Sequence, residues 1–414
     1  MMKYKLGDIA KTGSGGTPKS TVAEYYENGN IPWINSGELN NPFISSTSNF
    51  ITQKGYDNSS AKLFPPQTVL LAMYGATAGK ASLLEFEACT NQAICAIMPN
   101  QDILLPRFLK YKLDTMYNYL VGLSTGSARD NLSQDGIKAL ELCIPPLSEQ
   151  KKIASVLSAL DDKIALNKKM NQKLEAMAKR LYDYWFVQFD FPDKNGRPYK
   201  TTGGPMTYNP TLKREIPEGW EVKRLGKSVE VLKDGTHNPP ARVENGIPLL
   251  TGTMFGENFL DYTKATYISK EDYLAIHSKY QPLKNDIIIT KIGTLGNVNI
   301  LRDIDIPIAI HCNSALLRFK KVFGSYYPFF FCKSDLFQLR LKSVKGQSIQ
   351  EFASLDKIAS VLCEIPSEEI LKSFNNAVEP IMRQLIRTSK EVTRLTALRD
   401  KLLPLLMNGQ VEVK

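Results

Sequence analysis

Apolar residues recur in alternating steps of four and three in two long stretches of the chain, one in the middle and one at the end. A period of 3.5 residues held over four heptads is typical of coiled coils, because only that spacing keeps one stripe of a helix facing a partner helix. Ser148, followed by Glu149 and Gln150, supplies a start for the first helix. The stripe positions are Ile153, Leu157, Leu160, Ile164, Asn167, Asn171, Leu174, Ala178, Leu181 and Trp185 in the first stretch, and Leu371, Phe374, Val378, Ile381, Leu385, Thr388, Val392, Leu395, Arg399, Leu402 and Leu406 in the second.

Four of these stripe positions are polar or charged, namely Asn167, Asn171, Thr388 and Arg399. Polar residues in such a seam favour one register of the two helices at some cost in stability. Pro380 and Pro404 lie inside the second stretch, and a proline within a helix removes a hydrogen bond and clashes with the preceding turn. We therefore expect two helices paired in one register, with the second helix kinked or broken at its prolines.

The rest of the chain reads as short β-type runs separated by turns. Examples are Ile31–Ile34, Thr68–Met73 and Ala93–Met98, and a short helix is expected around Arg107–Tyr119. The segment 190–210 contains four prolines and three glycines, which predicts a linker or an ordered crossover loop between two β-rich parts.

The second β-rich part repeats the first at an offset of about 216 to 222 residues. Gly16-Thr17 is matched by Gly235-Thr236, the turn from Gly75 to Gly79 by the turn from Gly293 to Gly296, and Asn91-Gln92-Ala93 by Asn313-Ser314-Ala315. Because order and spacing agree over some 200 residues, we predict an internal duplication.

Together these patterns predict an α+β fold, in which two pseudo-repeated β-rich domains are separated by two long helices packed as an antiparallel coiled coil. The expected parts are a first β-rich domain (1–147), a central helix (148–189), a linker or crossover (190–215), a second β-rich domain (216–366) and a C-terminal helix (367–414).

Composition favours a soluble, cytoplasmic protein with real hydrophobic cores. Hydrophobic residues make up 43% of the chain, without an apolar run of 18 residues or an N-terminal leader. The six cysteines are scattered, so reduced thiols in the core are expected. The net charge of +10 permits nucleic-acid binding, but residues 1–147 hold 12 basic and 12 acidic side chains. Any grip on a polyanion must therefore come from local loops or from a partner protein.

Two glycine- or proline-rich segments resemble catalytic motifs, and each lacks an essential part. Gly75–Lys80 is one residue too short for a phosphate-binding loop, and Ala81 replaces the hydroxyl that binds Mg²⁺. Asn238-Pro239-Pro240 resembles the tetrapeptide of amino-methyltransferases, but Ala241 stands where that motif needs an aromatic residue.

Asp193, Glu221 and Lys223 have the outline of a metal-dependent nuclease triad. Asp193, however, lies in the proline-rich segment, which is a poor place to hold Mg²⁺ geometry. The three histidines have no metal-ligand spacing. We predict neither a catalytic residue nor a metal site.

The remaining candidates are loops that recur at matching places in both β-rich parts. They combine glycine turns and hydroxyl groups with isolated Lys, Arg, Asn, Gln or His side chains, which suit contacts with phosphates and base edges. For any single residue an ordinary solvated turn is the alternative, whereas recurrence favours function for the set. The candidate DNA-binding residues are Ser14, Thr17, Lys19, Tyr74, Thr77, Lys80, Arg129, Asn131, Lys233, Thr236, His237, Arg242, Lys291, Thr294, Lys345 and Gln347.

Three further stretches carry a family resemblance. They are Ile144–Ala154 (IPPLSEQKKIA), Ile216–Trp220 (IPEGW) and Leu395–Gly409 (LTALRDKLLPLLMNG). With them the chain resembles, over essentially its whole length, the specificity subunit of type I restriction–modification systems. The resemblance implies that each β-rich domain is a target-recognition domain that reads one part of a split sequence in double-stranded DNA.

The same resemblance implies a subunit that is not itself an enzyme. Two methyltransferase subunits would dock on the helices, and motor-nuclease subunits would join them for restriction, with no membrane involved. S-adenosylmethionine, ATP and Mg²⁺ would be bound by those partners and none by this chain. Two alternatives stay open, namely a single-chain restriction enzyme with its own nuclease activity and a two-module scaffold without a role on DNA.

The first stripe spans 33 residues, or roughly 50 Å at about 1.5 Å per residue. That length is about one and a half turns of B-DNA, at ~34–36 Å per turn. We therefore expect the helix pair to act as a ruler between two half-sites that flank an unread spacer. Because the first domain is neutral, we also expect the chain alone to bind DNA weakly.

Overall fold

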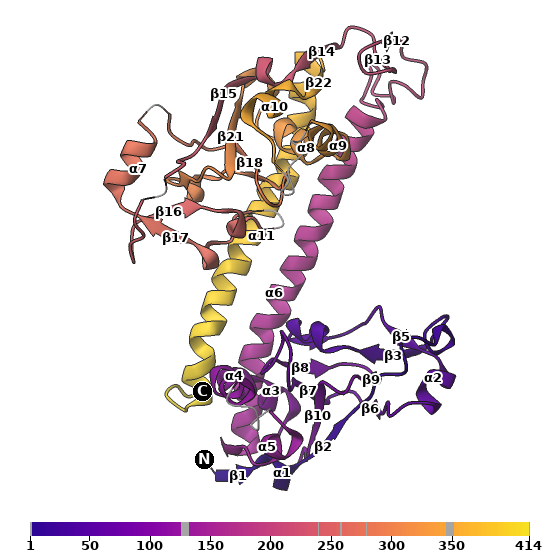
Figure 1. Ribbon diagram of the computed structural model, residues 1–414, viewed down its shortest axis with the longest axis vertical. Helices are drawn as coiled ribbons and strands as arrows, with labels where there is room; N and C mark the ends of the chain where they lie inside the picture. The colour runs from indigo at the N-terminus through magenta and orange to yellow at the C-terminus, as the bar shows by residue number, and fades with distance from the viewer. Residues whose placement is uncertain are drawn as a thin grey trace. The chain divides into compact units, whose positions relative to one another are not determined.

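Two long helices form the framework of the chain (Figure 1). The computed structural model describes residues 2–125, 132–238, 240–256, 259–278, 280–344 and 352–413. Helix α6 spans Leu147–Tyr182 and continues into a π-helical turn at Asp183–Val187, and helix α11 spans Glu368–Met407. The second helix was expected to be kinked or broken at its prolines, and a break is wrong, because α11 runs without interruption through Pro380 and Pro404. Both prolines face solvent, while Val378 and Met382 beside Pro380 are buried and hold the helix in place.

The two helices pair in antiparallel fashion. Arg399 contacts Asp161, and Thr388 contacts Asn171, so the contact position on α11 falls as the position on α6 rises. Every predicted stripe position is buried or half-buried. Among them Ile153, Leu157, Ile164 and Leu385 are buried, and Leu160, Leu174, Leu181, Ile381, Val392, Leu395 and Leu402 are half-buried.

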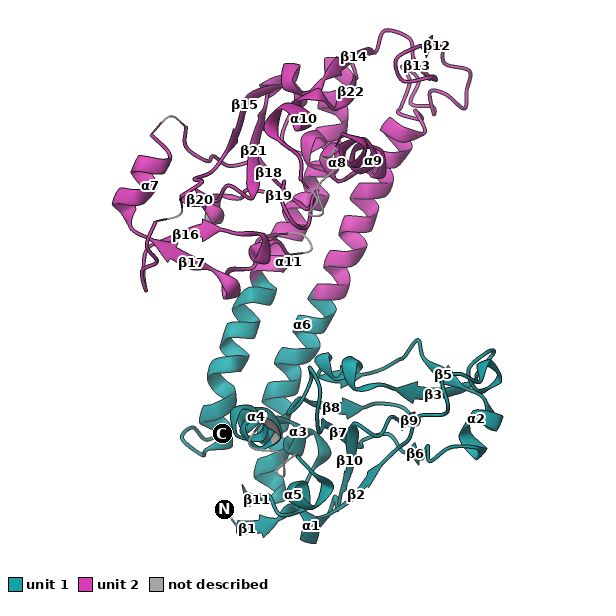
Figure 2. Cartoon of the chain, in the orientation of Figure 1, with its two compact units in different colours: residues 1–167, 391–414 teal, residues 168–390 magenta. Residues whose placement is uncertain are grey.

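By its contacts the chain divides into two compact units (Figure 2). Unit 1 comprises residues 1–167 and 391–414, and unit 2 comprises residues 168–390. Each unit therefore holds one β-rich region and one part of each long helix. This division cuts through both helices and does not decide the boundaries expected from the sequence, which stay predictions.

The described residues of unit 1 form three sheets. β1 (Met2–Lys5) pairs with β11 (Glu141–Ile144). A five-stranded sheet has the order β2 (Ala10–Ser14), β10 (Ile94–Pro99), β7 (Val69–Ala72), β8 (Ala81–Leu84) and β4 (Phe43–Ile44). A four-stranded sheet has the order β5 (Phe50–Ile51), β3 (Ile31–Ile34), β9 (Ala88–Thr90) and β6 (Leu63–Phe64). The helices are α1 (Leu6–Ile9), α2 (Gln53–Asp57), α3 (Pro106–Thr115), α4 (Tyr117–Thr125) and α5 (Gln134–Lys138), with 3-10 turns at Ala23–Tyr25 and Ser36–Asn40.

Unit 2 repeats this plan. β14 (Glu221–Arg224) pairs with β22 (Leu362–Ile365). One sheet has the order β15 (Val229–Asp234), β21 (Ser314–Phe319), β18 (Ile287–Thr290) and β19 (Val298–Ile300), and another has the order β17 (Thr266–Ile268), β16 (Ile247–Leu250) and β20 (Ala309–Ile310). The helices are α7 (Lys270–Ile276), α8 (Tyr327–Lys333), α9 (Asp335–Ser343) and α10 (Leu355–Ser360), with 3-10 turns at Leu225–Lys227, Gly252–Met254, Tyr262–Lys264, Asp303–Asp305 and Lys321–Phe323.

The strand registers fix the internal repeat residue by residue. Ser14 ends β2 opposite Cys95, and Asp234 ends β15 opposite Ala315. The glycine that follows each of them is therefore Gly15 in unit 1 and Gly235 in unit 2. The sequence-based match of Gly16 with Gly235 is wrong by one position. By the same registers, the match of Asn91 with Asn313 is wrong by two, because Asn91 corresponds to His311.

The proline-rich segment is an ordered crossover. Pro192 and Pro198 form an isolated β-bridge, and β12 (Met206–Asn209) pairs with β13 (Arg214–Pro217). The ring of Phe191 stacks on Tyr199 at 4.6 Å between centroids and on Trp220 at 5.6 Å. These rings join the large core of unit 2, which also contains Phe374 of α11.

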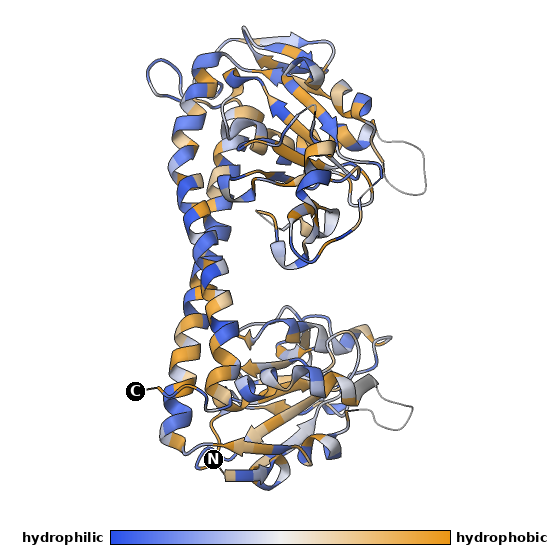
Figure 3. Cartoon of the chain, turned by 90° about the vertical axis from the view of Figure 1, so that its left-hand side faces the viewer, coloured by the Kyte–Doolittle hydropathy of each residue, from blue (hydrophilic) through white to orange (hydrophobic). Residues whose placement is uncertain are grey.

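Hydrophobic residues gather on the central strands and on the helix faces toward them (Figure 3). In unit 1, the core between the sheet and α3 contains Leu71, Leu83 and Phe108, and it extends to Leu157 of α6. The two glycine hairpins described below are thus anchored at the ends of buried strands, β7 and β8 in unit 1 and β18 and β19 in unit 2.

Candidate nucleic-acid interface

The glycine turn after β2 holds the first group of candidate residues. A Cβ atom on Gly15 would lie 1.9 Å from the Thr90 carbonyl oxygen, so only glycine allows this close approach. Beyond the turn, the Thr17 hydroxyl donates a hydrogen bond to Gln92 Oε1 at 2.5 Å. Ser14 Oγ accepts one from Gln134 Nε2 at 2.7 Å. Thr17 and the following candidate Lys19 are exposed.

The hairpin between β7 and β8 holds the second group. Gly75 and Gly79 have φ values of +86° and +78°, which favour glycine. Tyr74 is 45% exposed, and its ring is open to a ligand. Thr77 is buried, and its hydroxyl donates to the Ser36 carbonyl oxygen at 2.9 Å. Lys80 is half-buried and donates to Asn40 Oδ1.

In unit 2 the glycine turn after β15, which corresponds to the turn after β2, carries a cluster of charged groups. Lys291 Nζ lies 2.8 Å from Asp234 Oδ2, and His237 Nε2 lies 3.3 Å from the same oxygen. The Lys291 side chain is only 5% exposed and lies over the Phe352 ring, whereas the His237 side chain is 72% exposed. Partial burial acts to raise the pKa of the Asp234 carboxyl, but the Lys291 ammonium outweighs it and holds that pKa below its usual range.

The other candidates of unit 2 are more exposed. Lys233, Arg242 and Thr294 all face solvent. Thr236 is half-buried, and its hydroxyl donates to the Asn238 carbonyl oxygen at 2.8 Å. Four candidates of the full set, Arg129, Asn131, Lys345 and Gln347, lie outside the described residues.

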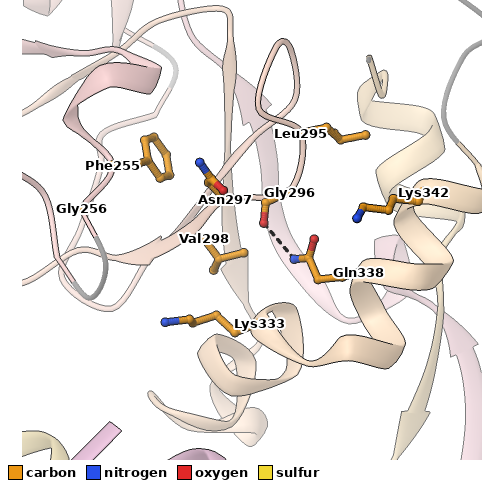
Figure 4. A pocket seen from close by; sticks show the side chains of 9 residues that line it. All are labelled: Phe255, Gly256, Leu295, Gly296, Asn297, Val298, Lys333, Gln338 and Lys342. Atoms are coloured by element: carbon orange, nitrogen blue, oxygen red, sulfur yellow. Dashed lines mark hydrogen bonds between the residues drawn. The ribbon is translucent and has the colours of Figure 1, made fainter. Parts of the chain in front are cut away.

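A pocket of about 480 Å³ opens beside the second glycine hairpin (Figure 4). Its walls include Phe255, Asn297 of the hairpin and Lys342 of α9. Gln338 of α9 donates to the Gly296 carbonyl oxygen at 2.8 Å. A Cβ atom on Gly296 would lie 2.2 Å from Gln338, so α9 packs directly against this hairpin. The φ of Gly296 is +93°, which also favours glycine at this position. The pocket is thus lined by the exposed Asn297 amide, which lies near the Phe255 ring, and by Lys342 on the side of α9.

The apparent nuclease triad has structural partners instead. Asp193 Oδ1 accepts from the backbone N–H groups of Asn195 and Arg197, each at 2.8 Å, and these bonds and the Arg197 side chain lower its pKa. Lys223 pairs with Glu221 on the exposed strand β14. In the part of the chain that the structure describes, no group of three or more His, Cys, Asp or Glu side chains is placed to hold a metal ion. Four of the six cysteines are buried as expected, but Cys143 is exposed.

Two polar residues of these sites were missed from the sequence. Gln92 holds Thr17, and Asp234 holds both Lys291 and His237. The signal for Asp234 was its place directly before the repeated glycine turn. Gln92 lies next to Asn91 in a repeat element whose alignment was wrong by two residues.

Comparison with known proteins decides the family. The model of the type I restriction modification DNA specificity domain matches residues 1–176. The specificity subunit of the type I restriction enzyme MjaIX from Methanocaldococcus jannaschii is 32% identical, with 99% of this chain and 93% of that protein aligned. The chain belongs to the specificity subunits of type I restriction–modification systems. The family expected from the sequence is thus confirmed.

Other relatives agree with this assignment. The HindI specificity subunit of Haemophilus influenzae is 25% identical, with 99% of each chain aligned. The crystal structure of the S subunit of a type I system from M. genitalium has the same fold, with a TM-score of 0.60, 18% identity and coverage of 98% of this chain and 95% of that one. The expected α+β fold with two β-rich regions and two long packed helices is confirmed.

As a specificity subunit, the chain is the DNA-specificity component of a type I restriction enzyme complex and is itself non-catalytic. Within the described residues, no helix is both long and apolar enough to span a membrane.

Proposed function

We propose that this specificity subunit reads a bipartite sequence in double-stranded DNA, with the β-rich region of each unit contacting one half-site. The observation that carries this proposal is the repeated glycine turn. Gly15 and Gly235 approach a neighbouring backbone carbonyl in the same way, and each is followed two residues later by an exposed hydrogen-bonding side chain, Thr17 or His237. Two similar but chemically different sites in one chain suit two different half-sites.

The helix pair supports a fixed, unread spacer between the half-sites. α6 and α11 contain 36 and 40 residues, or about 54 and 60 Å at ~1.5 Å per residue. Both helices cross the division between the units, and polar contacts fix their register on each side of it, at Asp161–Arg399 and at Asn171–Thr388. Because its register is fixed, the helix pair has a single length, and a spacer that sets the distance between two half-sites needs this property.

We further propose that α6 docks a methyltransferase subunit. Met170, Met177 and Tyr184 repeat every seven residues and are 37%, 54% and 37% exposed, and this stripe borders the face of α6 that packs on α11, where Gln384 Nε2 lies 3.9 Å from the Met170 sulfur. Exposed apolar side chains in one stripe are typical of a protein interface. Lys169, Lys173 and Arg180 lie exposed along one edge of this stripe, so an amphipathic partner helix with acidic residues fits it.

The chemistry of the complex belongs to its partners in this proposal. Two methyltransferase subunits supply S-adenosylmethionine binding and methyl transfer, and motor-nuclease subunits supply ATP- and Mg²⁺-dependent cleavage. The described residues of this chain offer loops for phosphate and base contacts, and the salt-sensitive part of the grip is shared with the partners.

Deletion of the gene followed by mapping of methylated adenines across the host genome tests the proposal. The expected result is the loss of one motif with two read parts and a fixed spacer, and its return when the gene is restored. Loss of a single uninterrupted motif, or of none, would overturn the proposal.

A further inference from the structure

We infer that Thr17 and His237 are equivalent base-contacting residues and that each presents a hydrogen-bond acceptor to an exocyclic amino group in the major groove, adenine N6 or cytosine N4. This inference rests on the proposed function, because it names which part of each unit meets the DNA and with what chemistry.

Their equivalence follows from the strand registers. Ser14 and Asp234 are the last residues of β2 and β15, and each lies opposite the matching residue of the neighbouring strand, Cys95 or Ala315. The third residue after each of them is Thr17 or His237. Both side chains are exposed. Each comes two residues after a glycine that packs closely against a backbone carbonyl oxygen of a neighbouring strand.

In unit 1 a neighbouring amide determines what Thr17 presents. The hydroxyl has a single proton, which it donates to Gln92 Oε1. The lone pairs on Thr17 Oγ1 therefore remain for an incoming donor. The turn is rigid, since Trp33 Nε1 donates to the Gly16 carbonyl oxygen at 3.0 Å and a Cβ on Gly16 would meet Ser60 Oγ at 2.1 Å.

In unit 2 a carboxylate determines what His237 presents. Asp234 can only accept hydrogen bonds, so the ring nitrogen 3.3 Å from it, Nε2, carries the proton. With the proton on Nε2, the other ring nitrogen, Nδ1, is the atom left to accept. Lys291 holds the carboxylate from the buried side, which makes Lys291 a positioning residue and not a phosphate contact.

The supporting residues differ between the units. By the registers, Asp234 corresponds to Ser14 and Lys291 corresponds to Met73. Each unit therefore presents a hydrogen-bond acceptor at its surface but holds that acceptor in place with different supporting residues. A change at Thr17 or Gln92 should alter one half-site only, and a change at His237 or Asp234 should alter the other.

Methylation mapping in cells that carry the full set of partner subunits tests this division. Thr17→Val keeps the size of the side chain and removes the acceptor, whereas Thr17→Ser keeps the acceptor and is the matched control. We expect T17V to relax the motif at one amino-bearing base of one half-site, His237→Phe to relax one base of the other half-site, and T17S to keep the motif. Relaxation in the same half-site for both variants, or an unchanged motif with both, would overturn the inference.

Binding by the purified methyltransferase complex gives a second measurement for any variant that loses methylation altogether. The probes are the motif duplex and duplexes in which purine replaces one adenine or 2-pyrimidinone replaces one cytosine, so that a single amino group is removed. Loss of the contacted amino group should weaken parent binding about fivefold to tenfold and T17V binding by less than about twofold. Equal losses for both proteins at every position would overturn the inference.

The two levels of the account fail differently. If gene deletion removes a bipartite motif but these variants leave both half-sites unchanged, the assignment of Thr17 and His237 is wrong and the proposed function stands. If deletion removes no bipartite motif, both are wrong.

Discussion

Arg399 of α11 donates a hydrogen bond to Asp161 of α6 at 2.9 Å. Asp161 is buried, with 6% of its surface exposed, and it also accepts from the Tyr111 hydroxyl of α3 at 2.6 Å. One carboxylate thus ties both long helices to a helix of the β-rich region within unit 1. These hydrogen bonds fix the register of the helix pair and the position of α3 at the same point.

Removing Arg399 should leave the Asp161 charge buried without its cation. Arg399→Met is expected to lower the free energy of unfolding of unit 1 by about 3 kcal/mol, at the lower end for broken buried pairs because Tyr111 still donates. Denaturant unfolding of the full chain measures this loss. The exposed Arg394 on the same helix provides the control, since Arg394→Met should change stability little. Equal effects of the two variants would contradict this role of the pair.

The contact of Thr388 with Asn171 makes a different prediction, because both groups are neutral and buried. Asn171→Ala leaves Thr388 without that partner and should destabilise unit 2 by about 1–3 kcal/mol. The double variant Asn171→Leu with Thr388→Val removes both polar groups and should melt at or above the parent temperature. Thermal unfolding distinguishes the two, with the exposed substitution Gln172→Ala as the control. A double variant less stable than N171A would count against a purely register-setting role.

His277 predicts how stability depends on pH. Burial lowers its pKa from 6.5 to about 4, and its Nε2 accepts from the Ile310 backbone N–H at 3.2 Å. Because the folded state resists protonation, the unfolded state binds more protons below pH 6.5. This stabilisation is therefore complete above the unfolded pKa and is lost as the pH falls toward 4, in total about 3 kcal/mol. His277→Gln, which keeps an acceptor, should show a flatter decline between pH 6.5 and 4. Parallel unfolding curves for the two proteins across that range would refute the assignment.

The exposed stripe on α6 predicts where a methyltransferase subunit docks. Met177→Glu places a charge in the centre of the stripe and should weaken binding of that subunit by about tenfold or more. Because the Met177 side chain is exposed, the melting temperature of the isolated chain should stay close to the parent value. Gln172→Glu adds the same charge to another face of α6 and should leave binding unchanged. Isothermal titration with the purified subunit measures both, and equal affinities would exclude this stripe as the docking surface.

Much of the architecture could be predicted because it depends on periodic patterns. The 3.5-residue stripes found the two helices, and the offset of about 220 residues found the duplicated sheets. A break at Pro380 was wrongly expected, since the buried neighbours Val378 and Met382 hold the helix together across one missing hydrogen bond at a solvent-facing position.

The candidate sites were less predictable, since residue type does not reveal burial. Lys291 looked like a phosphate contact, but its ammonium group is buried beside Asp234. Thr77 looked like a loop hydroxyl, but it is bonded inward to Ser36. The partners that determine these orientations lie far away in the sequence, as with Thr17 and Gln92. That these residues lie close together becomes evident only when the pairing of the strands is known.

The most direct test of the account lengthens the helix pair. One heptad inserted between Asp161 and Asn171 of α6, with a second inserted between Thr388 and Arg399 of α11, keeps both polar contacts and adds about 10 Å, or roughly three base pairs. Methylation mapping should then report the same two half-sites with a spacer longer by about three base pairs. An unchanged spacer in a complex that still methylates DNA would contradict the claim that these helices set the distance between the half-sites.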